Sequence, residues 1–310
     1  ASNAGAQAVK IQTYTPDTIT IDHSEKEFFI TDENNIWKGQ SLYDLYDKAH
    51  TPWEWHEEIF KRAKKNGITI FSTPFDESAV DFLEDLDVPA YKIASYENVH
   101  LPLIEKVART GKPMIISTGL ASISEIDDLV KTILKSGNDN YALLKCTSAY
   151  PAPHEDSNVT TIPHMRKLFQ CEIGLSDHTL GVGASLAAIA HGASIIEKHF
   201  TLSREEGGVD SSFSLEPKEL ELLIVESKRA WQSLGEIKYG PSELEKSGLK
   251  NRRSLYIVKD IKKGDHITES NLRAIRPGLG LKPKYYDIVI GRKANRDLKK
   301  GTALKWDYLK

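Results

Sequence analysis

The sequence predicts an α/β protein, built as a parallel (β/α)8 barrel and followed by a small, mostly β domain. Two observations support this prediction. Strand-like and helix-like segments alternate from residue 8 to residue 234, and the chain becomes rich in Lys and Gly after residue 250. Alternation at this spacing is typical of parallel βαβ units. An open, doubly wound sheet is the alternative, because the pattern contains seven strands and a closed barrel of this kind has eight.

The predicted elements follow one another regularly along the chain. A strand at 8–14 precedes a polar and aromatic excursion at 15–50, which we expect to be a functional loop because it is too long for an ordinary connection. The other predicted strands are 67–75, 90–97, 112–119, 140–151, 171–179 and 193–200, and the predicted helices are 51–66, 76–87, 98–111, 122–137, 181–191 and 217–234. The opening residues ASNAGAQAVK have the character of a helix end, so we expect one strand and one helix to precede this segment.

The tail has a different character from the barrel. We place the barrel at 1–238, a linker at 239–250 and the small domain at 251–310. Within the tail, KDIKKGDHITESNL at 259–272 is similar to RDLKKGTALKWDYL at 296–309. An internal repeat of this kind predicts a small domain with two related halves.

Composition narrows the class of protein. The chain has 310 residues, of which 40% are hydrophobic and 27% charged, and this is enough for one large and one small domain. A net charge of -3 gives no general attraction for nucleic acid or anionic lipid. No membrane span or signal peptide is evident, and Cys146 and Cys171 lie in apolar runs as reduced core residues would. We therefore expect a cytoplasmic protein.

Two histidines, His178 and His199, are predicted to end neighbouring strands that are joined by the Ala-rich helix at 181–191. In parallel α/β proteins the active site lies at the carboxyl ends of the strands. Two imidazoles suit an open metal site, in which water or substrate supplies the remaining ligands, but they cannot close a structural zinc site. A strand-end histidine that only forms a hydrogen bond to a neighbour is the commoner case.

Polar side chains also occupy the ends of the other predicted strands. They comprise Lys10, Gln12, Ser72, Thr73, Lys92, Ser95, Glu97, Ser117, Thr118, Lys145 and Thr147. Lysines and hydroxyls that converge in this way suit the phosphate and carboxylate groups of an anionic substrate. Lys145 leaves a second class of enzyme open, because a lysine within a barrel strand can form a Schiff base with a keto acid and act as a lyase.

Segments along nearly the whole chain together resemble the sialic-acid (nonulosonate) synthase family, whose members condense phosphoenolpyruvate with an N-acetylated amino sugar. They are VKIQT at 9–13, FSTPF at 71–75, KIAS at 92–95, ISTG at 116–119, GLSDHT at 174–179, EKHFT at 197–201, and RRSLY followed by IRPGLG in the tail. The segment at 37–56 is more similar to the branch that makes pseudaminic acid than to the branch that makes N-acetylneuraminate.

The resemblance implies a TIM barrel with a C-terminal antifreeze-like (SAF) domain, a domain-swapped homodimer, and a divalent metal, Mn²⁺ with Mg²⁺ or Co²⁺ as alternatives, held by His178 and His199. It also implies substrate-binding roles for Lys10, Gln12, Thr73, Lys92, Ser95, Ser117, Tyr150, Ser176 and Arg276, and catalytic roles for Glu97, Glu197 and Asp210. Arg276 would reach the N-acyl group of a sugar bound in the neighbouring subunit. Ser148 stands where neuraminate synthases usually have Asn, and the family's N-terminal strand, with an expected carboxylate, is absent from the sequence.

For the pseudaminic branch, the sugar would be 2,4-diacetamido-2,4,6-trideoxy-altropyranose. Aromatic side chains of the excursion and the following helix either form apolar walls for this sugar or only pack the loop against the barrel: Trp37, Tyr43, Tyr46, Trp53 and Trp55. The alternative products are N-acetylneuraminate and legionaminate, made from an N-acetylmannosamine-type sugar. A non-catalytic alternative is a carbohydrate-binding tail carried on an inactive barrel.

Overall fold

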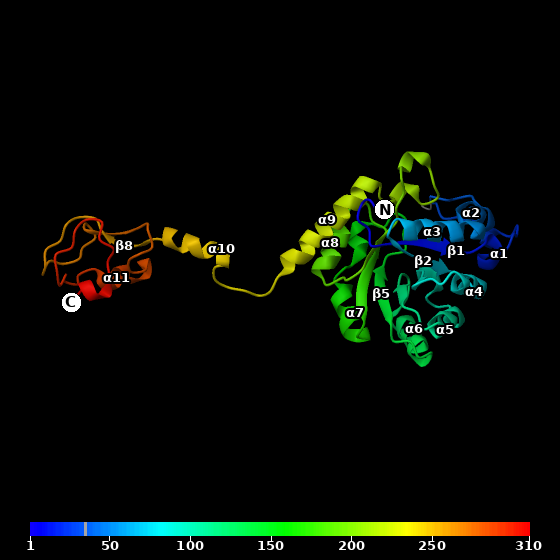
Figure 1. The fold of residues 1–310 in the computed structure, drawn as a ribbon, viewed down its shortest axis with the longest axis horizontal. Helices are drawn as coiled ribbons and strands as arrows, with labels where there is room; N and C mark the ends of the chain where they lie inside the picture. The colour runs from blue at the N-terminus through cyan, green and yellow to red at the C-terminus, as the bar shows by residue number, and fades with distance from the viewer. Residues whose placement is uncertain (34–35) are drawn as a thin grey trace. The chain divides into compact units, whose positions relative to one another are not determined.

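The structure is a computed structural model that describes residues 1–33 and 36–310. Two residues of the excursion, 34–35, therefore lie outside the described part. The chain forms two compact units, Ala1–Gly235 and Glu236–Lys310, which are coloured from blue to yellow and from yellow to red in Figure 1. We describe each unit by itself.

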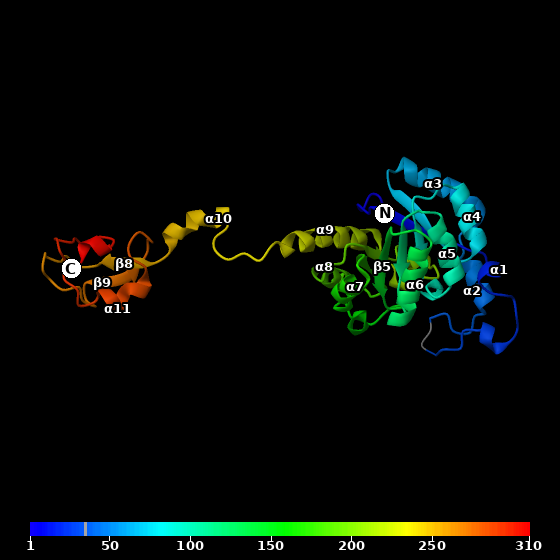
Figure 2. The same cartoon turned by 90° about the horizontal axis from the view of Figure 1, so that it is seen from below.

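The first unit is organised around a sheet of seven parallel strands, in which every strand pairs with the next one along the chain. The strands are β1 Ala8–Thr13, β2 Thr69–Pro74, β3 Tyr91–Ile93, β4 Met114–Ser117, β5 Tyr141–Cys146, β6 Glu172–Asp177 and β7 Ile196–Lys198. A doubly wound sheet reverses its strand order partway, whereas this order runs in one direction throughout. The sheet is curled and close to a TIM barrel, so the doubly wound alternative is wrong (Figures 1 and 2).

Helices cover the outer face of this sheet (Figures 1 and 2). They are α3 His56–Lys65, α4 Glu77–Asp85, α5 Leu101–Arg109, α6 Ile123–Lys135, α7 Thr161–Phe169, α8 Gly183–Ala190 and α9 Pro217–Leu234. Their ends follow local chemistry: the Asp76 carboxylate accepts from two backbone N–H groups at the start of α4, and Ser122 and Glu125 form a capping box on α6. No helix in the described part of the chain is long and apolar enough to cross a membrane.

The main core lies between the sheet and these helices. Fully buried Leu83, Ile93, Leu103, Ile116 and Leu143 belong to one continuous apolar cluster there. Burial of this apolar surface is the dominant stabilising contribution to such a fold. It leaves the opposite face of the sheet, inside the barrel, free to carry polar groups.

The excursion after β1 contains two short helices, α1 Pro16–Ile19 and α2 Leu42–Ala49. Two tryptophans attach it to the barrel, one within the excursion and one shortly after it. The Trp53 ring stacks on Phe82 at 4.6 Å, and Trp37 Nε1 donates to the Val209 carbonyl at 3.0 Å. The Trp37 hydrogen bond therefore holds the excursion close to the loop that follows β7.

The second unit has its own small core, which includes Leu255, Ile257, Leu272 and Val289. Its regular elements in the described chain are β8 Ser254–Ile257 and the antiparallel β9 Leu272–Ile275, with α10 Glu243–Lys246 and α11 Tyr286–Val289. Only a few residues are in strands; turns and isolated bridges form the rest of the domain.

The repeated sequence in the tail forms a reciprocal contact between its two copies. Ile261 and Leu298 exchange both backbone hydrogen bonds, at 2.8 and 2.9 Å. Asp260 accepts from Lys299 Nζ at 3.0 Å, and Asp297 accepts from Lys262 Nζ at 2.9 Å. Equivalent residues thus make equivalent bonds across a local pseudo-two-fold axis, as expected of two related halves.

Candidate active site

The inner face of the barrel is set by strand alternation. Val9 and Ile11 of β1 pack outward against the α3 layer, so Lys10 and Gln12 face the interior. Paired residues of neighbouring strands face the same side of the sheet, so the strand register identifies the inner residues of the other strands. Gln12 is paired with Thr73 of β2, and on the far side Ser176 of β6 is paired with Glu197 of β7. Gln12, Thr73, Ser176 and Glu197 therefore share one surface. Ser72, also predicted to lie there, is in register with Tyr91 of the outer core and has its Oγ 2.6 Å from Thr13 Oγ1, so it faces the helices instead.

Glu197 connects the two lysines of this surface. Its Oε1 accepts from Lys10 Nζ at 3.3 Å and from Ser176 Oγ at 3.0 Å, and Lys92 Nζ lies at 3.8 Å. Burial alone would raise the pKa of this carboxyl, but the charges of Lys10 and Lys92 outweigh it and lower the pKa to about 2. Two cations and one fixed anion leave this part of the barrel positively charged.

Lys92 is 1% exposed and has only polar neighbours at its amine. It donates to Ser117 Oγ at 2.6 Å and to the Ile93 carbonyl at 2.8 Å. Burial lowers the pKa of this amine to about 8, and Glu197 opposes the shift. A buried ammonium with a single carboxylate at 3.8 Å is well suited to receive a second anion.

Hydroxyl groups lie beside these charges. Thr73 Oγ1 is buried and has no hydrogen-bond partner within the described residues. Ser95 Oγ accepts from the Gly119 amide at 3.1 Å. A Cβ at Gly119 would collide with the hydroxyls of Ser95 and Ser148, so the glycine allows these groups to approach each other. An unsatisfied buried hydroxyl calls for an explanation, and a bound ligand would provide one.

Glu97 ends the short 3-10 turn Ser95–Glu97 that follows β3. Its Oε2 is buried and unpartnered among the described groups. Burial raises the pKa of this carboxyl to about 7, with Lys92 opposing the shift. Glu97 and Glu197 therefore differ: one exchanges a proton near neutral pH, and the other stays ionised.

The rings of His178 and His199 lie together, with centroids 5.3 Å apart. His178 Nδ1 donates to the Thr147 carbonyl at 2.9 Å, and His199 Nδ1 lies 3.3 Å from Asp210 Oδ2. A ring that donates from Nδ1 carries its lone pair on Nε2, where a metal can bind. Metal-binding histidines are usually oriented by a hydrogen bond from the ring nitrogen that does not bind the metal, and Nδ1 is that nitrogen here.

This donor set fits an open metal centre. Burial lowers the pKa of His199 although Asp210 opposes it, which favours the neutral ring that binds metal. Burial acts the same way on His178, but its contacts with Cys146 and Thr147 raise its pKa overall. Among the described residues no group of three or more His, Cys, Asp or Glu is placed to hold a metal. Water or substrate oxygens would have to complete the coordination.

An aromatic wall stands over the histidines. Tyr150 lies 4.5 Å from the His178 ring and 5.9 Å from Trp37, and Phe213 lies 5.0 Å from His199. Of the aromatic residues suggested for the sugar pocket, Trp37 is the one that joins this wall. The others have separate contacts: Trp53 on Phe82, Tyr46 on Tyr14, Tyr43 with Asp17, and Trp55 58% exposed.

The structure corrects the interpretation of Lys145. On β5, Cys146 is in register with the inward Ser176, whereas Lys145 is in register with Leu175 of the outer core. A Schiff-base lyase would need its amine inside the barrel, so that alternative is wrong. Cys146, predicted from its apolar neighbours to be only a core residue, belongs to the site, since its sulfur lies 3.9 Å from His178 Nδ1. Strand alternation could have identified it once the inner face was known.

Arg276 lies directly after β9, in the second unit. Its role at a neighbouring subunit's sugar therefore stays a prediction. Among the predicted site residues of the barrel, Tyr150 and Asp210 lie in the loops after β5 and β7, and the others lie on the inner strand faces or directly after them.

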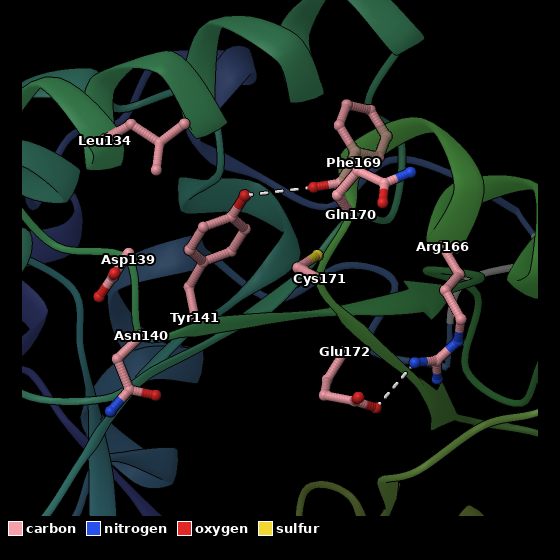
Figure 3. Close-up of a pocket in the computed structure, with 9 residues that line it drawn as sticks. All are labelled: Leu134, Asp139, Asn140, Tyr141, Arg166, Phe169, Gln170, Cys171 and Glu172. Carbon is pink, nitrogen blue, oxygen red and sulfur yellow. Dashed lines mark hydrogen bonds and ion pairs between the residues drawn. The ribbon is translucent and has the colours of Figure 1, made fainter.

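A hollow of about 690 Å³ lies at the opposite strand ends between α6 and α7 (Figure 3). Two of its charged side chains are already paired, since Arg166 donates to Glu172 at 2.9 Å. Tyr141 Oη also donates to the Phe169 carbonyl, at 3.5 Å. No unsatisfied group converges there as it does at the carboxyl ends, so this hollow does not have the chemistry of an active site.

Comparisons with known proteins agree with this geometry. Residues 1–239 match the NeuB family and residues 252–310 match the SAF domain. The chain is 43% identical to a pseudaminic acid synthase of Helicobacter pylori over 98% of this chain and 89% of that protein. It is 35% identical to an N,N'-diacetyllegionaminic acid synthase of Campylobacter jejuni over 98% of this chain and 92% of that protein. A crystal structure of an N-acetylneuraminic acid synthetase from Leptospira borgpetersenii, bound to citrate, superposes with a TM-score of 0.69, at 33% identity over 80% of this chain and 81% of that one.

Proposed function

The chain belongs to the NeuB family and carries a SAF domain, and on that premise we propose that it is a pseudaminic acid synthase. It condenses phosphoenolpyruvate with 2,4-diacetamido-2,4,6-trideoxy-altropyranose and water, and gives pseudaminic acid and phosphate. The higher identity to a pseudaminic than to a legionaminic acid synthase, 43% against 35%, supports this branch. The observation that supports the chemistry is the cationic pocket of Lys10 and Lys92 beside the two histidines.

Phosphoenolpyruvate binds through its phosphate and carboxylate. Lys10 and Lys92 supply the charge, and the hydroxyls of Thr73, Ser95 and Ser117 supply neutral donors. The unpartnered Thr73 hydroxyl and the buried Lys92 amine support this assignment, because each gains an anionic acceptor on binding. Glu197 holds the two lysines in position and stays ionised while it does so.

The sugar binds between this pocket and the aromatic wall. Gln12, Tyr150 and Ser176 contact it, and Asp210 orients His199. Trp37 closes the wall from the excursion and covers the apolar C6 methyl of a trideoxy sugar.

His178 and His199 would hold a divalent cation, for which we propose Mn²⁺ with Mg²⁺ or Co²⁺ as alternatives. When bound, such an ion polarises the aldehyde oxygen of the open-chain sugar. The thiol of Cys146 and the Thr147 carbonyl fix the His178 ring from behind, and Asp210 fixes the His199 ring.

The reaction balances without another reactant. The π electrons of phosphoenolpyruvate form a bond from C3 to the aldehyde carbon, and the aldehyde oxygen takes up a proton. Water then bonds to C2 and loses one proton. The C2–O bond to the phosphate breaks, the phosphate leaves with the bonding electron pair, and it takes up the proton of the C2 hydroxyl as the C2 carbonyl forms. Glu97 accepts the proton of the water, since the pKa of this carboxyl is about 7, near the pH at which a general base is most effective.

The second unit acts between subunits in this proposal. A domain-swapped homodimer, in the cytoplasm, brings Arg276 of the partner subunit to the N-acyl group of the sugar. Arg276→Ala should raise the KM for the sugar and leave the dimer intact, as measured by sedimentation. A monomeric active enzyme would contradict the swapped arrangement.

The deciding experiment is phosphate release from phosphoenolpyruvate with Mn²⁺ and three sugars in parallel: the diacetamido-trideoxy-altrose, N-acetylmannosamine and the diacetamido sugar of legionaminate synthesis. Release with the first alone supports the proposal. Release with another sugar moves the chain to that branch, and no release with any sugar contradicts the whole function. Oxygen-18 from solvent should appear in the keto acid, and label in the phosphate would contradict attack of water at C2.

A further inference from the structure

We propose that the cavity lined by the first turn of α6, by α7 and by Lys145 is a second binding site, for a small anion with an apolar body, and that its occupancy changes the reaction inside the barrel. The two helices lie on either side of β5 (Figures 1 and 2). The cavity has a volume of about 370 Å³, within the range of small-molecule sites. It lies on the outer face of the sheet and shares no lysine with the phosphoenolpyruvate pocket.

The lining is mostly apolar, with Lys145 as its lysine and Thr118, Thr161 and His164 as its other polar side chains. Ile126, Met165 and Phe169 line it together with the stem of Lys145. At the rim, Leu120 is 72% and Leu168 is 48% exposed, a concentration of uncovered aliphatic surface around one opening. Surface of this kind, next to a concave lining, marks a place where an apolar group binds.

Lys145 is the residue that makes this cavity favour an anionic ligand. Its amine donates to the Cys146 carbonyl and to Thr147 Oγ1, both at 3.0 Å, and both acceptors are neutral. None of the described carboxylates forms an ion pair with it, and no acidic residue lines the cavity. Burial lowers the pKa of this amine, so an anion that entered the cavity would relieve the cost of the buried charge.

The same two residues, through other atoms, connect the cavity to the active site. The Thr147 carbonyl receives His178 Nδ1 at 2.9 Å, and Cys146 places its sulfur 3.9 Å from the same atom. A ligand that draws the Lys145 amine toward itself loosens its bonds to the Cys146 carbonyl and the Thr147 hydroxyl. The backbone that orients His178 is therefore shared by both sites, and this is the physical route for coupling.

The test uses the complete chain and the amphipathic fluorescent anion 8-anilinonaphthalene-1-sulfonate as the probe. We expect saturable binding at one site, unchanged by saturating phosphoenolpyruvate. Lys145→Met should weaken it by about tenfold or more, because a charge-assisted contact is lost. Displacement by phosphoenolpyruvate, or unchanged affinity in Lys145→Met, would overturn the proposed site.

Two further variants distinguish the loss of the binding site from a general loss of folded structure. Ile123→Glu places a negative charge at the rim, on a residue that is 58% exposed and begins α6, where an acidic side chain suits the helix. This variant should weaken binding of the probe as strongly as Lys145→Met does. Leu134→Glu is the matched control: it adds the same charge to the same helix, on a residue that is 50% exposed at the far end, and should bind the probe normally.

Coupling has its own readout, which rests on the proposed function. With saturating probe, the kcat/KM for phosphate release should change by about fivefold or more in the parent, and not in Lys145→Met. An unchanged rate overturns the coupling even where binding is seen. If no sugar supports phosphate release, the proposed function fails, and the probe titrations still decide whether the cavity is a site.

Discussion

At the carboxyl ends of the strands, Lys92 and Glu197 lie 3.8 Å apart with side-chain exposures of 1% and 17%, whereas at the amino ends Arg166 and Glu172 form a pair at 2.9 Å with exposures of 36% and 61%. The exposed pair is solvated and satisfied, and such pairs contribute about 0–1 kcal/mol. The buried charges have little solvent around them that could replace a lost partner. Removing one leaves the rest uncompensated, at a cost of about 3–5 kcal/mol.

This difference argues against the hollow in Figure 3 as the active site. The volume of a cavity alone gives little binding energy, and Arg166, Glu172 and Tyr141 of this hollow already have partners. The carboxyl ends present a buried hydroxyl on Thr73 and a carboxylate oxygen on Glu97 that lack them. Binding energy comes from satisfying such groups, so substitutions at the two ends should differ in effect by orders of magnitude.

The largest effect is expected for Lys92→Met. It keeps most of the side-chain volume but removes the buried donor to the phosphate, and the rate of phosphate release should fall by about 10³-fold. Lys131→Met, at an exposed lysine on α6, is the control. A Lys92→Met enzyme that is folded by circular dichroism and within tenfold of the parent rate would break the comparison.

His199→Ala should come next, with about a 10²-fold loss of rate. Binding of Mn²⁺, followed by electron paramagnetic resonance, should weaken in parallel, and chelation of the parent should stop phosphate release until Mn²⁺ is restored. His191→Ala, at an exposed histidine after α8, should change neither. Full activity in the presence of a chelator would contradict the assignment.

Glu97 predicts a dependence on pH. Its raised pKa of about 7 means that the ionised base forms as the pH rises, so kcat/KM should increase through that pH and then level. Glu97→Gln should lower the rate of phosphate release by about 10²-fold and abolish this rise of kcat/KM with pH.

The same shift has a consequence for stability. A carboxyl whose pKa is raised on folding favours the folded state below its unfolded value of 4.5, and this contribution is lost as the pH rises through about 7. Glu97→Gln should therefore gain stability relative to the parent above pH 7, as measured by urea unfolding. An equal difference at pH 5 and pH 8 would argue against a buried, protonated Glu97.

A smaller effect is expected at the aromatic wall. Trp37→Ala should raise the KM for the sugar by about tenfold and leave the KM for phosphoenolpyruvate unchanged, because it removes apolar contact at one side of the pocket only. Trp55→Ala, in the neighbouring segment and 58% exposed, is the matched control. Equal effects of the two variants would mean that Trp37 only packs the excursion.

The smallest effect is expected at the opposite strand ends. Arg166→Ala breaks an exposed pair beside the large hollow and should change stability by about 1 kcal/mol or less, with phosphate release unaltered. A loss of activity comparable to that of His199→Ala would show that the hollow in Figure 3 has a catalytic role after all.

Much of the fold could be predicted because it depends on local patterns. Strand-and-helix alternation identified the barrel, and the repeat in the tail corresponds to the reciprocal bonds of Asp260 and Asp297. The strands also located the site, since His178 and His199 directly follow the ends of β6 and β7, and Lys10 and Lys92 lie within β1 and β3. These features follow from chain direction and spacing, which a sequence contains.

Other features required the tertiary structure. Lys92 and Lys145 are both lysines of buried strands, yet one faces the interior and the other the helices. Parallel strands are buried on both faces, so they lack the polar alternation that would distinguish these faces in the sequence. Likewise, Glu97 and Glu197 are the same residue type with pKa values of about 7 and about 2. That difference arises from lysines on β1 and β3, which only the closed packing of distant strands brings to Glu197.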